Sequence, residues 1–242
     1  NESIMRKWDG TTVTRWGIDK PSSAATTSSV AGGSISAVNG GYRWKYAFGS
    51  STSAHVGQIS DATAISGNFT SLNYVITGST NVTDTQVNRV HVYRTADDGA
   101  TYFELSNSPV TYSTSWSLTD SSTDETLTTE EAQIAGQNAP PTASHGGVFF
   151  VGRIWTFAGD TVYFSNFEEQ ENGVEEESFA DTNRFSFGQL VTGLAVTQRA
   201  LLVFTASSIY KIRGDSVLTF LREPFLNRIG ATAIANIAQG GG

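Results

Sequence analysis

The sequence predicts an all-β protein that combines a β-sandwich with a set of β-meanders, and three observations lead to this prediction. Apolar and polar residues alternate over short segments, as they do in half-buried strands. Clusters of Gly, Asn, Asp and Ser separate these segments, as turns do. The chain has 242 residues, which is enough for two domains of ordinary size. We therefore expect short strands, polar turns and two cores.

The clearest alternation lies between residues 42 and 48, where aromatic side chains occupy every second position. The same period returns around residues 72–76, 90–92 and 116–118, so we expect strands there as well. The turn Asp97-Asp98-Gly99 predicts a hairpin between residues 90–94 and 102–105, because Asp and Gly tolerate positive φ. We expect six of these residues to contribute to one core: Tyr42, Trp44, Tyr46, Tyr74, Val92 and Trp116.

Two linker-like stretches bound this region, a Ser- and Thr-rich run from Pro21 and a Pro-containing run ending at Pro141. Between them the chain has about the ~100 residues of an immunoglobulin-like sandwich. We therefore place a fibronectin III-like sandwich at residues 22–138. Residues 1–21 are expected to be the end of a propeller-like β segment, and residues 139–242 are expected to form propeller-like blades.

The region after Pro141 reads as two successive meanders. Apolar runs at residues 148–151, 153–157 and 161–165 predict the first, and runs at 190–196, 200–204 and 208–212 predict the second. The runs of the second meander are continuous, so we expect both of their faces to be covered. Propellers need about four blades or more to close, so the prediction is a partial propeller. The last residues, 229–242, are expected to be a strand or loop that enters another blade.

Composition excludes several classes of function. Lys and Arg number 15 against 23 Asp and Glu, which gives a formal net charge of −8. A broad phosphate-gripping surface is therefore not expected, nor is sequence-specific binding of nucleic acid. There is no Cys, which removes disulfides, thiolate metal sites and Cys nucleophiles. No apolar run is long enough to span a bilayer, and residues 1–7 lack the apolar core of a signal peptide.

Several segments resemble known phage proteins. The segment Tyr42-Arg43-Trp44-Lys45-Tyr46, together with Tyr93-Arg94-Thr95 before a Gly hairpin, resembles the fibronectin type III-like modules of bacteriophage tail proteins. The segments at 152–165, 193–196 and 208–212 are similar to the propeller blades of podovirus tail nozzle and tail-tube proteins. The segment from Arg222 to Gly230 resembles a passage between blades, and residues 8–21 resemble a blade end that precedes an inserted module.

The resemblance implies a structural virion protein, not an enzyme, that forms a homo-oligomeric ring with neighbouring tail proteins and shapes the conduit for genome ejection. The expected location is the tail of the virion, after synthesis in the host cytoplasm. The acidic composition fits a wall past which DNA slides. The alternative is a bacterial surface or secreted adhesion protein whose sandwich binds carbohydrate. A propeller glycosidase is a third, weaker hypothesis.

No catalytic, cofactor-binding or metal-binding residue is assigned. The acidic run from Glu168 to Glu177 does not match a calcium loop, so a solvated loop is the better interpretation. A glycosidase would need paired carboxylates such as Asp160 and Glu168 at a defined separation. The remaining candidates lack the sequence context of a site, or are better explained as core or chance matches: His55, His91, His145, Ser165, Ser207, Gly32-Gly33, Gly40-Gly41, Asn68, Asn81, Trp44, Trp116 and Trp155.

Overall fold

Antiparallel sheets make up the fold. The computed structural model describes residues 5–8, 10–53, 55–78, 82–127, 132, 138–167 and 177–231. Five antiparallel sheets are present in these ranges, and none of them closes into a barrel. A short 3₁₀ turn, η1 (Asp124–Thr126), lies among them. Within the same ranges, no helix has the length and apolarity needed to cross a membrane. The predicted all-β fold class is confirmed.

The chain divides into two compact units, which are described separately. One unit runs from Gly17 to Ala139, and the other combines the residues up to Trp16 with those from Pro140 onward. This compact unit thus begins at Gly17, whereas the sequence places the start of the sandwich at residue 22. Ile18 accounts for the difference, because its side chain is fully buried in the core of the first unit. The side-chain amide of Gln86 also donates to the carbonyl of Gly17 at 2.9 Å.

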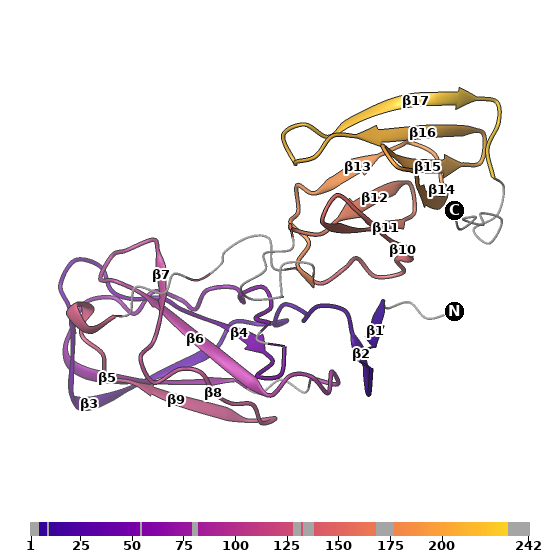
Figure 1. The fold of residues 1–242 in the computed structure, drawn as a ribbon. Coiled ribbons are helices and arrows are strands. Elements are labelled where there is room, and N and C mark those ends of the chain that lie inside the picture. Colours follow the sequence, from indigo (N-terminus) through magenta and orange to yellow (C-terminus); the bar gives the residue numbers. More distant parts are fainter. Residues whose placement is uncertain are drawn as a thin grey trace. The chain divides into compact units, whose positions relative to one another are not determined.

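The unit from Gly17 to Ala139 is a sandwich of two sheets (Figure 1). One sheet has the strand order β3 (Thr26–Ala37), β5 (Phe69–Gly78), β9 (Trp116–Asp120). In the other, β6 (Arg89–Thr95) pairs with β4 (Trp44–Gly49), β7 (Tyr102–Glu104) and β8 (Val110–Thr111). The predicted hairpin is present between β6 and β7, and Asp98 in its turn has a φ of 58°.

The core of the sandwich lies between these sheets and is rich in aromatic side chains. The six core residues predicted from the alternation are all buried in it. The ring of Trp44 packs against Tyr74 with centroids 4.6 Å apart, and Tyr46 packs against Trp116 at 5.0 Å. Both ring pairs are tilted, and aromatic contacts at such distances add to the stabilisation from burial alone. The predicted alternation thus identified the inward face of each strand.

One edge of β4 is covered by residues 57–66, a segment that is not itself a strand. Every third backbone N–H of this segment donates to every second carbonyl of residues 42–48. Hydroxyl oxygens of the segment in return accept hydrogen bonds from backbone N–H groups of residues 42–46. The N–H to carbonyl bonds are Gly57 to Phe48, Ser60 to Tyr46, Thr63 to Trp44 and Ser66 to Tyr42, and the returning bonds are Tyr46 to Ser60, Trp44 to Thr63 and Tyr42 to Ser66. We call this segment the hydroxyl comb.

The hydroxyl comb solves a problem that every sheet edge presents. An edge strand exposes a row of unpaired N–H and C=O groups, which can pair with another chain. Here the hydrogen bonds recur at every third residue of the comb and at every second residue of the strand. Two residues of a strand span about 7 Å. Each hydroxyl therefore meets an N–H that a bare edge would leave open. The comb holds β4 from one side while β6 holds it from the other.

The second unit contains two four-stranded meanders and a short ribbon. The ribbon pairs β1 (Arg6–Trp8) with β2 (Val13–Arg15). The first meander has the order β10 (His145–Phe150), β11 (Arg153–Ala158), β12 (Thr161–Phe164), β13 (Arg184–Ser186). The second has the order β14 (Val191–Val196), β15 (Leu201–Thr205), β16 (Ser208–Arg213), β17 (Leu221–Asn227). Each meander therefore has one strand more than the sequence predicts.

The two meanders share one apolar core. Trp155 and Phe157 of the first sheet and Leu201, Val203 and Ile212 of the second are buried in it. Along β15, buried positions alternate with half-exposed ones. One face of the second sheet is therefore covered, while its other face is only partly shielded. The prediction that both faces are covered is wrong for this strand, because its outward positions Leu202 and Phe204 stay half-exposed.

The strand β17 replaces the predicted passage between blades. It pairs with β16 through a register shift, and Pro224 lies opposite Tyr210. Proline within a sheet is confined mainly to edge strands because it has no N–H, and β17 is the edge of its sheet. The apolar residues of this edge are largely exposed. Figure 1 shows the strand in yellow beside β16. The predicted blade entry at 229–242 lies mostly outside the described residues.

Candidate functional site

The most elaborate group of polar side chains lies at one end of the sandwich, around Arg94. Strand β6 alternates, so Arg94 falls on the same inward face as Val90 and Val92. Its side chain is completely buried. The guanidinium donates to Asp120 Oδ2 at 3.1 Å and to Asp124 Oδ1 at 2.9 Å. It also donates to the carbonyl of Ser122 at 2.7 Å.

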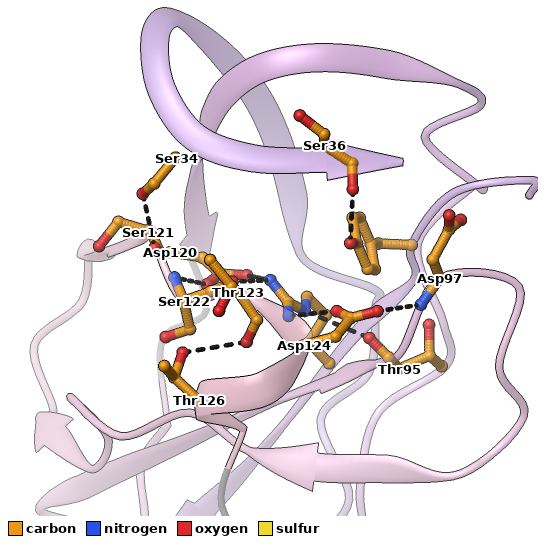
Figure 2. Close-up of polar contacts among 12 residues, drawn as sticks. Ser34, Ser36, Thr95, Asp97, Asp120, Ser121, Ser122, Thr123, Asp124 and Thr126 are labelled. Carbon is orange, nitrogen blue, oxygen red and sulfur yellow. Dashed lines mark hydrogen bonds and ion pairs between the residues drawn. The ribbon is translucent and has the colours of Figure 1, made fainter. Parts of the chain in front are cut away.

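The two carboxylates that face Arg94 are held by further donors. Asp120 ends β9 and accepts from the indole N–H of Trp44 at 2.9 Å and from the backbone N–H of Ser122 at 3.0 Å. Asp124 begins η1 and accepts from the backbone N–H of Asp97 at 2.9 Å. Figure 2 shows the contacts of Asp120 with Ser122 and of Asp124 with Asp97. Removing one partner of such a buried pair typically costs about 3–5 kcal/mol.

Asp97 links this group to the loop between β3 and β4. Its carboxylate accepts from the backbone N–H groups of Val38, Asn39 and Gly41 at 2.7, 2.9 and 2.8 Å. Burial alone would raise the pKa of Asp97, but these hydrogen bonds outweigh burial and hold the pKa below its ordinary value. The ionised carboxylate therefore fixes the β3–β4 loop.

Tyr42 closes the group from the core side. Its ring lies under Arg94, with the guanidinium carbon 4.4 Å from the ring centroid. Its hydroxyl donates to the carbonyl of Ser36 at 2.9 Å, a contact that Figure 2 draws at Ser36. Burial raises the pKa of this hydroxyl, and the negative charge of Asp124 raises it further. Tyr42 thus stays neutral and acts as a hydrogen-bond donor and a cation–π platform.

A pocket with a volume of about 330 Å³ opens beside this group. Hydroxyls, amides and carboxylates line much of it, and the residues around it are Ser34, Ile35, Ser36, Val38, Asn39, Tyr42, Asp97, Thr123, Asp124 and Glu125. The carboxylates of Asp97 and Asp124 already accept several hydrogen bonds from the protein. The arrangement is therefore suited to holding loops together.

A second polar group lies on the outer face of β6 and β7. His91 Nδ1 is 2.8 Å from Glu104 Oε1, and the hydroxyl of Ser108 donates to the same oxygen at 2.7 Å. Burial alone would raise the pKa of Glu104, but the contacts with His91 and Ser108 outweigh it and lower the pKa. Ser108 donates to the carboxylate and not to His91, so this group does not pair the Ser108 hydroxyl with an imidazole base. The prediction that His91 is a cross-strand partner fits this geometry.

The carboxylates considered for glycoside hydrolysis do not form a described pair. Asp160 lies in the turn between β11 and β12, where its oxygens accept from the hydroxyls of Thr161 and Ser186. These bonds hold the pKa of Asp160 below its ordinary value. Glu168 lies outside the described residues. Glu177, the last residue of the acidic run, is 4% exposed and pairs with Lys7, so it is not solvated. The rest of the run, which the sequence interprets as a solvated loop, lies outside the described residues.

The other sequence candidates have structural positions. Ser165 is buried, accepts from the backbone N–H of Ile154 and donates to the carbonyl of Asn166. The hydroxyl of Ser207 donates to Gln189. The side-chain amide of Asn68 donates to the carbonyl of Val38, and Asn81 lies outside the described residues. The remaining positions fall in strands, turns or cores: His55, His145, Gly32-Gly33, Gly40-Gly41, Trp44, Trp116 and Trp155.

The group around Arg94 was not assigned from the sequence, although a signal for it was present. The alternation that places Val90 and Val92 inward also places Arg94 inward, and the alternation of Trp116 and Leu118 does the same for Asp120. A buried cation and a buried anion on facing sheets point to a pair. Across the described part of the chain, no three His, Asp or Glu side chains are arranged to hold a metal ion.

Comparison with known proteins adds no relative. No protein-family model matches the chain, and no curated protein sequence is similar to it. The fold itself defines the class, which is an all-β protein of open antiparallel sheets with a two-sheet sandwich and two stacked meanders.

Proposed function

We propose that the chain is a structural component of a larger assembly, namely a ring in a phage tail that shapes the conduit for genome ejection. The observation that carries this proposal is the partly shielded apolar face of the sheet β14–β17. Residues that are paired across antiparallel strands share a face. The register therefore places Leu202, Phe204 and Leu226 on the face that points away from the shared core, together with Lys211 and with Ile209, which is already buried.

The exposed apolar residues of the second unit continue from this face along its edge. Leu226 is 40% exposed, Phe225 50%, Leu221 57% and Ile229 58%. Single exposed apolar residues are common, but a contiguous group of them marks an interaction surface. The first meander already covers the opposite face of this sheet. A further layer supplied by another subunit would bury the group in the same manner.

The proposal of a phage tail rests on a second argument besides this surface, namely the resemblance of the sequence to tail nozzle blades. The segments at 152–165, 193–196 and 208–212, which resemble nozzle blades, form β11, β12, β14 and β16 with their connections. The net charge of −8 also supports a conduit, because an acidic protein does not hold DNA phosphates in passage. The proposed partners are identical subunits and neighbouring tail proteins, with the virion as the location. No enzymatic activity is part of the proposal.

The experiment that tests the proposal measures the assembly state of the full chain. Sedimentation and negative-stain electron microscopy should show closed rings, with interfaces above the ~1,000 Å² of specific contacts. Leu202→Asp and Leu226→Asp should dissociate the rings, because each places a charge in the buried interface. Val30→Asp is the matched control, since Val30 is 48% exposed on the sandwich. A chain that stays monomeric at high concentration, or rings that the two variants leave intact, would contradict the proposal.

The alternative function, an adhesion protein that binds carbohydrate, has the pocket beside Asp97 in its favour. Its hydroxyl and carboxylate lining suits a sugar. However, Trp44, Trp116 and Trp155 are at most 3% exposed, so none of them offers a stacking platform. Binding of the full chain to immobilised neutral glycans, lost on Asn39→Ala at the pocket, would favour this alternative over the ring.

A further inference from the structure

A group of cations lies on the outer face of the sheet β4–β6–β7 in this acidic protein. Arg43, just before β4, and Lys45 within it point to the same side, because residues two apart in an extended segment share a face. Tyr102 of β7 lies across β6 from them, since Arg94 and Thr95 of β6 pair with Phe103 and Tyr102. Lys45 Nζ lies 4.8 Å from the centroid of the Tyr102 ring.

These cations are not paired in salt bridges within the described chain. Neither Arg43 nor Lys45 forms a salt bridge with any described carboxylate. Lys20, whose charge acts on Lys45, is paired with Asp61 at 2.7 Å. Glu104 of β7 does not compete for them, because His91 and Ser108 already hold its carboxylate. Among the described residues, Asp61 is thus the carboxylate whose charge acts on Lys45, and it is shared with Lys20, so positive charge is in excess beside Tyr102.

The partial burial of Lys45 makes its charge energetically unfavourable in the absence of a salt bridge. Its side chain is half-buried, and burial together with the charge of Lys20 lowers its pKa. Arg43 is exposed at the surface. Tyr102 is 7% exposed, and burial raises the pKa of its hydroxyl, which therefore remains a donor at neutral pH. An anion bound here would restore the charge balance that half-buried ions normally have.

We propose that Arg43, Lys45 and Tyr102 form a binding site for an oxyanion, the phosphate or carboxylate group of a ligand that docks on the outer face of the sandwich. The guanidinium fork of Arg43 fits two oxygens of such a group, and the ammonium of Lys45 acts as a point charge. The Tyr102 hydroxyl supplies a neutral donor. The site is rigid because β6 and the hydroxyl comb hold β4 from both sides. It does not depend on ring formation.

The test is a calorimetric titration of the full chain at low salt with pyrophosphate, with a uronic acid trisaccharide, and with neutral maltotriose. At least one anion should bind, and maltotriose should not. Binding of pyrophosphate alone identifies a free phosphate as the source, and binding of the uronate alone identifies an acidic saccharide. Arg43→Gln and Lys45→Met should each weaken binding about tenfold, the effect of losing one charge-assisted hydrogen bond.

Two controls separate a defined site from general attraction of anions. Tyr102→Phe should weaken binding by a smaller factor, since it removes a neutral donor only. Arg199→Gln removes an exposed cation of the other unit and should leave binding unchanged. Thermal melting of each variant checks that the sandwich stays folded. Failure of both anions to bind, equal binding of maltotriose, or an equal loss on Arg199→Gln would overturn the proposal.

Discussion

Individual hydroxyl and carboxylate acceptors determine how the loops of the sandwich are held. Asp97 accepts three backbone N–H groups of one loop, and Thr63 accepts the backbone N–H of Trp44 at 3.0 Å. Thr63 satisfies a buried donor, whereas the N–H groups of Val38 and Asn39 that Asp97 accepts lie in an exposed loop. An unsatisfied buried donor costs about 1–3 kcal/mol. The stability of the sandwich should therefore be sensitive to single acceptor atoms.

Thr63→Val tests the hydroxyl comb at one residue. Valine keeps the shape of threonine but cannot accept a hydrogen bond, so the N–H of Trp44 is left buried and unsatisfied. We expect the free energy of unfolding in urea to fall by about 1–3 kcal/mol. Thr119→Val is the control, because Thr119 is exposed on β9, and it should change stability by less than about 0.5 kcal/mol. Equal effects of the two variants would contradict this account of the comb.

The lowered pKa of Asp97 predicts how stability depends on pH. The folded-state pKa lies below the value of about 3.9 expected in the unfolded chain. The ionised carboxylate therefore stabilises the fold above about pH 4, and this contribution is lost as the pH falls through the folded-state pKa. We expect the wild type to lose more stability than Asp97→Asn between pH 6 and pH 2.5, measured by urea unfolding. Equal losses would show that Asp97 is not linked to folding.

In the sheet β3–β5–β9, a contact between a glycine and an aromatic ring helps to fix the register of β5 and β9. Gly78 of β5 lies directly opposite Trp116 of β9. A Cβ at Gly78 would lie 2.6 Å from the Trp116 ring, so the indole occupies the space that a side chain would need. A bulky aromatic ring over a glycine is a recognised way to pin strand register. The pairing of β5 with β9 should therefore depend on this glycine.

Gly78→Ala should lower the free energy of unfolding by about 1–3 kcal/mol, because the added methyl group overpacks the Trp116 ring. Gly147→Ala in β10 provides the matched control. Its Cβ would meet Met5 at an ordinary 3.5 Å, so we expect little change there. Chemical denaturation of both variants measures the difference. A neutral effect at Gly78 would mean that the ring moves aside without cost.

The strands predicted from the alternation of apolar and polar residues are present. Two segments without that alternation, the hydroxyl comb and β17, were not predicted as they are. Periodicity identifies β4, β6 and β9 because one face of each is buried. The hydroxyl comb has a period of three and forms no ladder of its own, so no strand or helix pattern reveals it. The strand β17 is largely exposed and contains Pro224, which made it resemble a connection. The alternation of apolar and polar residues therefore indicates which strands have one buried face, and it does not detect strands that are exposed.

At the scale of the whole molecule, the two units have separate cores. Among the described residues, those of the sandwich core lie between Ile18 and Leu127, whereas those of the meander core lie between Val148 and Phe220. We therefore expect a fragment of residues 17–139 to fold alone and to melt cooperatively with β-type circular dichroism. A fragment of the same residues carrying Trp44→Ala is the unfolded reference. A helical spectrum or a non-cooperative transition of the unsubstituted fragment would refute the prediction.

The polar group at Arg94 shows how far sequence reasoning reaches across the whole molecule. Alternation places Arg94 and Asp120 inward on their strands, but it cannot state that the two strands face each other at that level. The role of Asp124 depends on a 3₁₀ turn after β9, which no periodic pattern marks. The position of Arg43 and Lys45 near Tyr102 could not be predicted from the sequence either, because it depends on the register of β4 and β7 across β6.

The hydroxyl comb also provides a way to search for relatives of a chain that no family model matches. Its spacing, Gly57, Ser60, Thr63 and Ser66, requires a small or hydroxyl-bearing residue at every third position and leaves the two residues between them free. A distant homologue could therefore differ at most positions and still retain this triplet rhythm shortly after an alternating aromatic strand. Insertions of a single residue should be rare within the segment, because one insertion would shift every later hydroxyl away from its N–H partner.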